Sequence, residues 1–184
     1  MKKAECTWTN QGFTLRPALA ADAEMYFEQN FNLIDKEVAR LTGCKENFTR
    51  EEVVDFFLQC LEEEDRVDFL IIAPDGRIIG ESVINEIDWE TKSANFRIAL
   101  FHSSECGHGI GSWAIRITRD FAFEHLKLHR LELDVFSFNP RAEKAYRAAG
   151  FQREGVLRDA IWTGTEYADD ILMAILEDEW RAIK

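Results

Sequence analysis

The stretch Cys106-Gly107-His108-Gly109-Ile110-Gly111-Ser112 is the most informative part of the sequence, because three glycines alternate with other residues just before an amphipathic helix. Closely spaced glycines let the backbone curl so that several N–H groups point into one concavity. The helix that follows adds the positive end of its dipole. Together these features predict an anion site that suits a pyrophosphate.

Three nucleotide ligands use loops of this kind, and the residues around the glycines separate them. A Walker-type loop for ATP or GTP ends in Gly-Lys-Ser/Thr, whereas Gly111 is followed by Ser112 and Trp113. A dinucleotide-binding fold requires G-x-G-x-x-G, and here the third glycine is out of register. Coenzyme A is the third ligand, and neither objection applies to it.

Outward from the loop, the hydrophobic period alternates between strand-like and helical. Apolar runs and alternation predict strands over 12–17, 67–73, 77–84, 94–100 and 129–136, and two more around a turn at 163–165. Helical spacing predicts helices from Asp22, over 31–41, from Thr49, over 110–124 and from Pro140 to Gly150.

Two helix starts carry local signals. Thr49 with Glu52 three residues later has the spacing of a capping box. Asn139 is a cap with Pro140 at the first helical position, and Gly150 suits the residue just after that helix. The resulting order predicts an α+β fold with one βαβ crossover at its centre.

Length and composition indicate an ordinary soluble globular chain. The 184 residues suit one domain, and we expect a single domain over 1–184. Apolar runs are too short to span a bilayer, and the two N-terminal lysines precede no apolar segment typical of a signal peptide, so we expect a cytoplasmic protein without membrane contact. Four scattered cysteines without C-x-x-C spacing predict free thiols and no metal site.

The charge excludes one class of partner. A formal net charge of −12 argues against a nucleic-acid-binding surface, which needs a basic stripe. The same charge suits a cationic substrate such as an amine, although solubility alone also explains it. An acidic run at 62–65 leaves open a polycation site or a regulatory surface.

The glycine loop resembles the acetyl-CoA-binding signature of the GNAT superfamily of N-acetyltransferases, a Gln or Arg followed by x-x-Gly-x-Gly/Ala. Gly109 and Gly111 match the two small positions, and Cys106 departs from the usual Gln or Arg. Downstream, the segment from Asn139 to Phe151 resembles the family's asparagine, helix, tyrosine and Gly-Phe segment. The ends of the chain are similar to the Rim-type branch, which contains ribosomal-protein N-acetyltransferases and is similar to spermidine acetyltransferases. The likeness covers nearly the whole chain.

The resemblance implies a mixed, mostly antiparallel, twisted sheet flanked by helices, with a V-shaped splay for coenzyme A beside the central crossover. It implies that the 96–100 backbone pairs with pantetheine as an extra strand. Tyr146 matches the tyrosine that protonates the leaving thiolate, and a phenol is chemically suited to that role. The implied cofactor-binding residues are Ile98, Leu100, Gly107, His108, Gly109, Ile110, Gly111, Ser112 and Asn139.

The general base and the acceptor stay open. Glu86 is our first candidate base because it follows the 77–84 strand; the rivals are Asp88, Glu132 and Asp134. Four basic side chains are candidates for the ribose 3′-phosphate, namely Arg116, Arg119, Lys144 and Arg147. Rim-type similarity favours a peptide or protein α-amine, with polyamines, aminoglycosides and other small amines as alternatives, and a non-catalytic acyl-CoA-binding domain as the alternative of another class. Exposed sheet edges are compatible with a homodimer.

Overall fold

The computed structural model describes residues 6–184, so the N-terminal lysines lie outside the described residues. One eight-stranded sheet, in the order β1-β2-β3-β4-β5-β6-β8-β7, runs through this part of the chain. The strands are β1 (Trp8–Asn10), β2 (Phe13–Pro17), β3 (Val67–Ile72), β4 (Ile78–Asp88), β5 (Ser93–Leu100), β6 (Arg130–Phe136), β7 (Gln152–Trp162) and β8 (Tyr167–Leu176). The α-helices are α1 (Ala23–Asn30), α2 (Lys36–Thr42), α3 (Arg50–Glu62), α4 (Ile110–Glu124), α5 (Pro140–Ala148) and α6 (Glu177–Ile183), and short 3-10 turns lie at Ala20–Asp22 and Ser103–Glu105.

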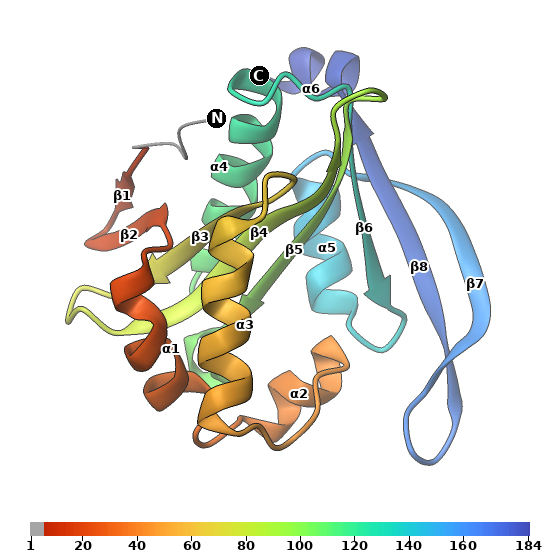
Figure 1. Cartoon of the computed structure of the whole chain (residues 1–184). Helices are drawn as coiled ribbons and strands as arrows, with labels where there is room; N and C mark the ends of the chain where they lie inside the picture. The colour runs from red at the N-terminus through yellow and green to blue at the C-terminus, as the bar shows by residue number, and fades with distance from the viewer. Residues whose placement is uncertain (1–5) are drawn as a thin grey trace.

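The strand directions confirm the expected mixed sheet. Every neighbouring pair in the described sheet is antiparallel except β5 and β6, which are parallel and joined through α4. That connection is the predicted βαβ crossover. Helices cover both faces, with α1 and α3 in front of the sheet in Figure 1 and α4 behind it.

The strand alternation sends side chains to two cores. Phe69 and Ile71 of β3 pack in the larger core with α4 and α5, whereas Leu70 between them packs in the smaller core with α1 and α3. Side chains of a strand alternate between the faces of its sheet, so one apolar run serves both cores. This is why 69–72 is continuously apolar rather than alternating.

The predicted caps are confirmed. The Thr49 side chain accepts from the Glu52 N–H, and Glu52 accepts in return from the Thr49 N–H, which is a capping box. Asn139 Oδ1 accepts from the Ala142 N–H at 3.2 Å, and Pro140 is the first residue of α5.

Besides the helix expected over 31–41, which begins only at Lys36 as α2, three elements differ from the expectation. A short strand β1 precedes β2 through a tight turn, and Trp8 packs edge-on against Phe69 of β3. The strand expected over 77–84 continues to Asp88, because pairing with β5 carries it on. The C-terminal residues Glu177–Ile183, for which no element is expected, form a helix, α6, whose Trp180 is buried against Phe123 of α4. Tertiary contacts that local periodicity does not show create all three.

An ion pair connects β2 to the turn before α1. Both Asp22 carboxylate oxygens lie 2.7 Å from the Arg16 guanidinium, and Asp22 also accepts from the Leu19 N–H at 2.8 Å. Asp22 is buried, so removing its carboxylate leaves a partly buried arginine without its partner.

We therefore expect Asp22→Ala to lower the free energy of unfolding by about 2–3 kcal/mol and the melting temperature by roughly 5–10 °C. Differential scanning calorimetry measures both. Glu24→Ala removes the exposed ion pair with Arg50 and should leave the melting temperature almost unchanged. Equal effects of the two variants on the melting temperature would contradict the stabilising role of the Arg16–Asp22 ion pair.

Candidate active site

The sheet opens between β5 and β6. The two strands pair only from Ser93 to Asn95, opposite 130–132, and then diverge, as Figure 1 shows. The Phe101 N–H bonds to Ile79 O of β4 at 2.9 Å, and by alternation the main-chain groups of Ile98 and Leu100 face the opening. Main-chain polar groups need partners. The edge is therefore built to accept an extended chain as a further strand.

The glycine loop lies near the end of β5, where the splay is open. Gly109 caps α4 with φ of 83°, and Gly107 has φ of 86°, a region that favours glycine. A Cβ added at either glycine would meet nothing within 4 Å, so the space beside the loop is open to a ligand. The first N–H groups of a helix have no partner within it. The loop therefore fits a pyrophosphate, as the sequence indicates.

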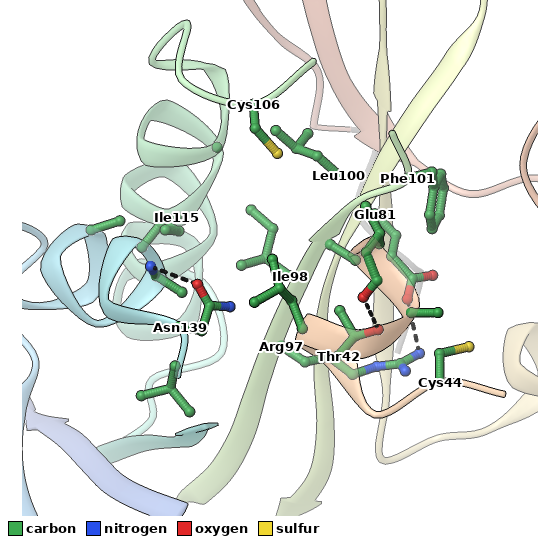
Figure 2. A pocket seen from close by; sticks show the side chains of 18 of the residues that line it. Thr42, Cys44, Glu81, Arg97, Ile98, Leu100, Phe101, Cys106, Ile115 and Asn139 are labelled. Atoms are coloured by element: carbon green, nitrogen blue, oxygen red, sulfur yellow. Dashed lines mark hydrogen bonds and ion pairs between the residues drawn. The ribbon is translucent and has the colours of Figure 1, made fainter. Parts of the chain in front are cut away.

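A cavity of about 1020 Å³ joins the loop, the opening and the face covered by α1–α3. Figure 2 shows Asn139 and Ile115 on one side, Glu81 and Arg97 on the other, and Ile98 between them. One continuous cavity therefore crosses the sheet at the splay.

Most of the implied cofactor-binding residues meet at this cavity. Those on its wall are Ile98, Leu100, Gly107, Gly109, Gly111, Ser112 and Asn139. The structure does not bring His108 or Ile110 to the wall: the His108 side chain is exposed, and the Ile110 side chain is buried in the larger core. Cys106 does line the cavity, where its Sγ lies 3.8 Å from His102 O.

Tyr146 of α5 also lines the cavity. Its ring packs edge-on against Phe96 and Phe151, with ring centroids 6.3 and 6.0 Å away. Burial raises the pKa of the Tyr146 hydroxyl, and the negative charge of Asp134 raises it further. The hydroxyl is therefore protonated at neutral pH and available as a donor.

On the opposite side of the splay, Glu81 of β4 lines the cavity. Its Oε2 accepts from the Tyr26 hydroxyl at 2.7 Å, and its Oε1 lies 3.3 Å from Nη2 of Arg97. Burial, followed by the charge of Glu81, raises the pKa of Tyr26 well above its usual range, so this hydroxyl stays a donor. Two partners thus hold the carboxylate in one place.

Sequence reasoning missed Glu81 and Arg97. Both lie inside strands, where a charged residue reads as the solvent side of an alternating pattern. A signal was present in β4, because Glu81 and Ser82 interrupt an otherwise apolar run, and buried strands rarely contain an acid without a partner.

The pairing of β4 with β5 places Glu86 and Glu81 at different ends of the splay. Asn85 of β4 lies opposite Asn95, and Glu86 sits in the bulge that follows, beside the closed end of the splay and exposed. The expectation that Glu86 follows its strand is wrong, because β4 continues to Asp88. Glu86 is not among the residues that line the cavity, so its role as the base stays a prediction. Glu81 pairs with Ala99 at the open end.

Of the three rival carboxylates, only Asp134 lines the cavity. Asp88 accepts from the N–H groups of the next turn, and Glu132 is exposed in an ion pair with Arg130. Asp134 does line the cavity, on β6.

Of the four basic side chains expected near the ribose phosphate, only Lys144 lines the cavity. Arg119 is buried and donates to Ala149 O, so the expectation that it meets the phosphate is wrong. Arg147 pairs with Glu143 of its own helix, and Arg116 is exposed on α4. Lys144 lines the cavity and stays a candidate.

The charge of the cavity differs from that of the chain. Its wall contains four cationic side chains and three carboxylates: Lys45, Arg97, Arg141, Lys144, Glu52, Glu81 and Asp134. Residues of the acidic run at 62–65 are not among the residues that line it. The excess negative charge therefore lies elsewhere on the surface.

Two further findings concern the described residues as a whole. Within 6–184, no helix combines the length and apolarity needed to cross a membrane. In the same range no three His, Cys, Asp or Glu side chains are grouped so as to hold a metal ion.

A mixed sheet splayed beside one parallel crossover, with an open strand edge and a glycine-rich loop beside it, defines the class of acyl-CoA-dependent transferases. Residues 13–152 match the family described as Acetyltransferase (GNAT) domain, and the chain belongs to that family. It is an acetyl-CoA-dependent N-acetyltransferase of the GNAT type.

Relatives of known sequence and structure agree with this assignment. The probable N-acetyltransferase YjcK of Bacillus subtilis (strain 168) is 26% identical over 176 residues, which cover 90% of this chain and 94% of the relative. The spermidine N-acetyltransferase from Vibrio cholerae, in complex with CoA and spermine, superposes with a TM-score of 0.82 at 24% identity, covering 94% of this chain and 99% of that chain. The ribosomal-protein-S5-alanine acetyltransferase from Vibrio fischeri gives a TM-score of 0.82 at 21% identity, covering 95% and 98%. At these identities the two structures show the fold.

We expect Gly109→Ala to raise the KM for acetyl-CoA by roughly 5- to 30-fold, because an L-residue at this left-handed position costs about 1–2 kcal/mol and displaces the N–H groups of the cap. Steady-state kinetics with varied acetyl-CoA measures it. Gly76→Ala is the matched control, since Gly76 has φ of 87° in open space at the β3–β4 turn. A KM unchanged by Gly109→Ala would contradict the role of the loop.

Proposed function

We propose that this protein transfers the acetyl group of acetyl-CoA directly to a primary amine in a ternary complex, and that residues 1–184 act as one acetyltransferase domain. The supporting observation is the cavity that crosses the splay, with Tyr146 and Asn139 on one wall and Glu81 on the other. A donor and an acceptor entering from opposite faces meet at the gap between β5 and β6.

In this proposal the chain binds acetyl-CoA along the β5 edge. The main-chain groups of Ile98 and Leu100 pair with the pantetheine arm, and the N–H groups from Gly107 to Ser112 hold the pyrophosphate. The side chain of Asn139 is half-buried at the wall and reaches the same arm. A main-chain N–H of β5 polarises the acetyl carbonyl where negative charge develops on its oxygen.

The transfer needs two proton movements on opposite sides of the splay. Glu81, directly or through one water, takes a proton from the acceptor ammonium, and the freed nitrogen attacks the thioester carbon. The new C–N bond replaces the C–S bond. Tyr146 gives its proton to the departing thiolate, and the excess proton of the amide nitrogen leaves to solvent, so protons and charges balance.

Among the three carboxylates of the cavity wall, Glu81 suits the base better than Asp134, and Glu52 is paired with Lys45. Its two partners, the Tyr26 hydroxyl and Arg97, fix its position at the open end of the splay. Asp134 is exposed on β6 and adds negative charge near Tyr146. That charge opposes ionisation of the acid, so Asp134 is suited to keep Tyr146 protonated between turnovers.

For the acceptor we propose a peptide or protein N-terminal α-amine. Such a group carries one positive charge on an apolar body, and the wall on this face combines Glu81 with the rings of Phe31, Phe48 and Phe101. A Rim-type neighbour of the same fold, named as a ribosomal-protein-S5-alanine acetyltransferase, is compatible with this acceptor.

A polyamine is the second candidate. It is favoured by the neighbour of the same fold that holds CoA and spermine, and by the two carboxylates, Glu81 and Asp134, that line the cavity on different strands. Aminoglycosides and other small amines belong to the same acceptor class. A non-catalytic acyl-CoA-binding domain would have no use for Tyr146 at the end of the splay.

The deciding experiment is mass-spectrometric detection of labelled acetyl transfer from acetyl-CoA at low enzyme concentration. The panel contains peptides beginning with Ser, Ala or Met, spermidine and an aminoglycoside. Transfer to the peptides is the expected result. Selective transfer to spermidine would contradict the peptide acceptor, and binding of acetyl-CoA without transfer to any amine would contradict the catalytic roles.

A further inference from the structure

Arg97 occupies an unusual place for a cation in an enzyme that acts on amines. It alternates along β5 with Ile98, so its side chain lies on the acceptor face while Ile98 lies in the splay (Figure 2). Its side chain is 44% exposed and lines the cavity. The negative charge of Glu81 raises the pKa of the guanidinium, which is therefore cationic at any pH of interest.

One contact leaves most of the Arg97 donors free. Within the described residues, the Arg97 guanidinium forms one ion pair, with Glu81 at 3.3 Å. A guanidinium has five N–H donors in a planar fork. The remaining donors face a cavity, where an oxygen of a bound acceptor can meet them.

The spacing of the two charges suits an α-amino carbonyl group. In an α-amino carbonyl compound, the amine nitrogen and the carbonyl oxygen are separated by two carbon atoms and lie about 3 Å apart. Glu81 attracts the ammonium and Arg97 attracts the oxygen, and these side chains are themselves 3.3 Å apart. An amine without a neighbouring oxygen still pairs with Glu81, but it offers no acceptor to the free N–H donors of Arg97.

The same cation disfavours a polyamine. On the acceptor face Arg97 compensates Glu81, and Lys45 lies 2.8 Å from Glu52 and compensates that carboxylate. A polycation entering here meets two carboxylates that each already have a cationic partner, so it gains little attraction and is repelled by Arg97 and Lys45.

The apolar part of the wall leaves room for a side chain on the α-carbon. Phe31 stands between Phe48 and Phe101, with ring centroids 5.4 and 5.5 Å away, and all three rings line the cavity. Apolar and aromatic substituents gain most from such a wall.

We propose that Arg97 is the specificity-determining residue of the acceptor site: it binds the carbonyl oxygen next to the acceptor amine and so selects α-amino carbonyl compounds, such as the first residue of a peptide, over polyamines and simple alkylamines. This inference rests on the proposed acetyl transfer to an amine and names the class of amine.

Two substrates that differ only in the carbonyl group test it. L-Phenylalaninamide and 2-phenylethylamine share ring, chain and amine, and differ by the carboxamide. Their kcat/KM values are measured for the unmodified enzyme and for Arg97→Met at saturating acetyl-CoA. We expect the ratio of amide to amine to fall by about 10- to 100-fold in the variant, because one charged hydrogen bond is lost for the amide alone. The kcat/KM for spermidine should rise relative to both.

The comparison also separates the ways in which the idea can fail. The different basicities of the two amines cancel, because each substrate is compared with itself across the two enzymes. Lys45→Met makes the same chemical change at the other acceptor-side cation and should leave the ratio unaltered. Equal losses on both substrates in Arg97→Met would show that Arg97 only supports Glu81, and faster turnover of spermidine than of the amide by the unmodified enzyme would overturn the inference. Absence of transfer to every amine, with acetyl-CoA bound, would instead remove the proposed function itself.

Discussion

Replacing Tyr146 by phenylalanine is expected to lower kcat by about 10²- to 10³-fold, the usual loss when a general acid is removed. The KM for acetyl-CoA should stay within about threefold, since the lost hydroxyl acts on charge that appears only in the transition state. The ring itself remains packed between Phe96 and Phe151, so the variant should fold normally. Stopped-flow or mass-spectrometric turnover at saturating substrates measures the change.

The chain offers a matched control for this variant. Tyr167 is 64% exposed at the β7–β8 hairpin, and Tyr167→Phe removes the same hydroxyl far from the splay. It should leave kcat unchanged. A Tyr146→Phe enzyme with full kcat would take Tyr146 out of the mechanism and leave solvent as the proton donor.

Glu81→Gln is expected to lower kcat/KM for the acceptor by about 10²-fold at neutral pH. The amide keeps the shape and the hydrogen bond from Tyr26 but accepts no proton. An α-amine has a pKa near 8, so below that pH the acceptor arrives as an ammonium ion that Glu81 must deprotonate. Above it the free amine predominates, and the deficit of the variant should shrink as pH rises from about 7 to 9. A pH series of kcat/KM for both enzymes measures this trend.

Two other carboxamide variants identify the base by contrast. Glu86→Gln tests the residue that sequence reasoning favoured, and its position beside the closed end of the splay predicts unaltered kinetics. Asp134→Asn tests the wall carboxylate on the β6 side of the splay. A pH-dependent loss in Asp134→Asn with none in Glu81→Gln would move the base to β6, whereas a pH-independent loss in Glu81→Gln would indicate a structural role.

Much of the fold could be predicted because its signals are local. The capping box at Thr49, the Asn139-Pro140 start of α5 and the period of α4 depend on residues within one or two turns of one another. The α6 helix and the β1 strand could not be predicted in that way. Trp180 is held by Phe123 and by a hydrogen bond to Asp120 at 2.8 Å, residues about sixty positions earlier in the chain.

The candidate site divides along the same line. The glycine loop, Asn139 and Tyr146 belong to short motifs, and the structure brings them to one cavity. Glu81 and Arg97 have no motif around them. They meet because β4 pairs with β5 in a register that places Glu81 opposite Ala99 and Val83 opposite Arg97, which turns both side chains to the acceptor face.

The sequence by itself therefore determined the class of fold and the position of the glycine loop, since both depend on periodicity and backbone geometry over a few consecutive residues. Its resemblance to the GNAT superfamily pointed to Tyr146 as the proposed acid. Only the tertiary structure decided which carboxylate faces the splay and that a cation stands beside it. The physical reason is strand register: a shift of one residue in the β4–β5 pairing would place Glu81 and Arg97 on opposite faces of the sheet, and register is set by packing across the whole sheet rather than by either strand alone.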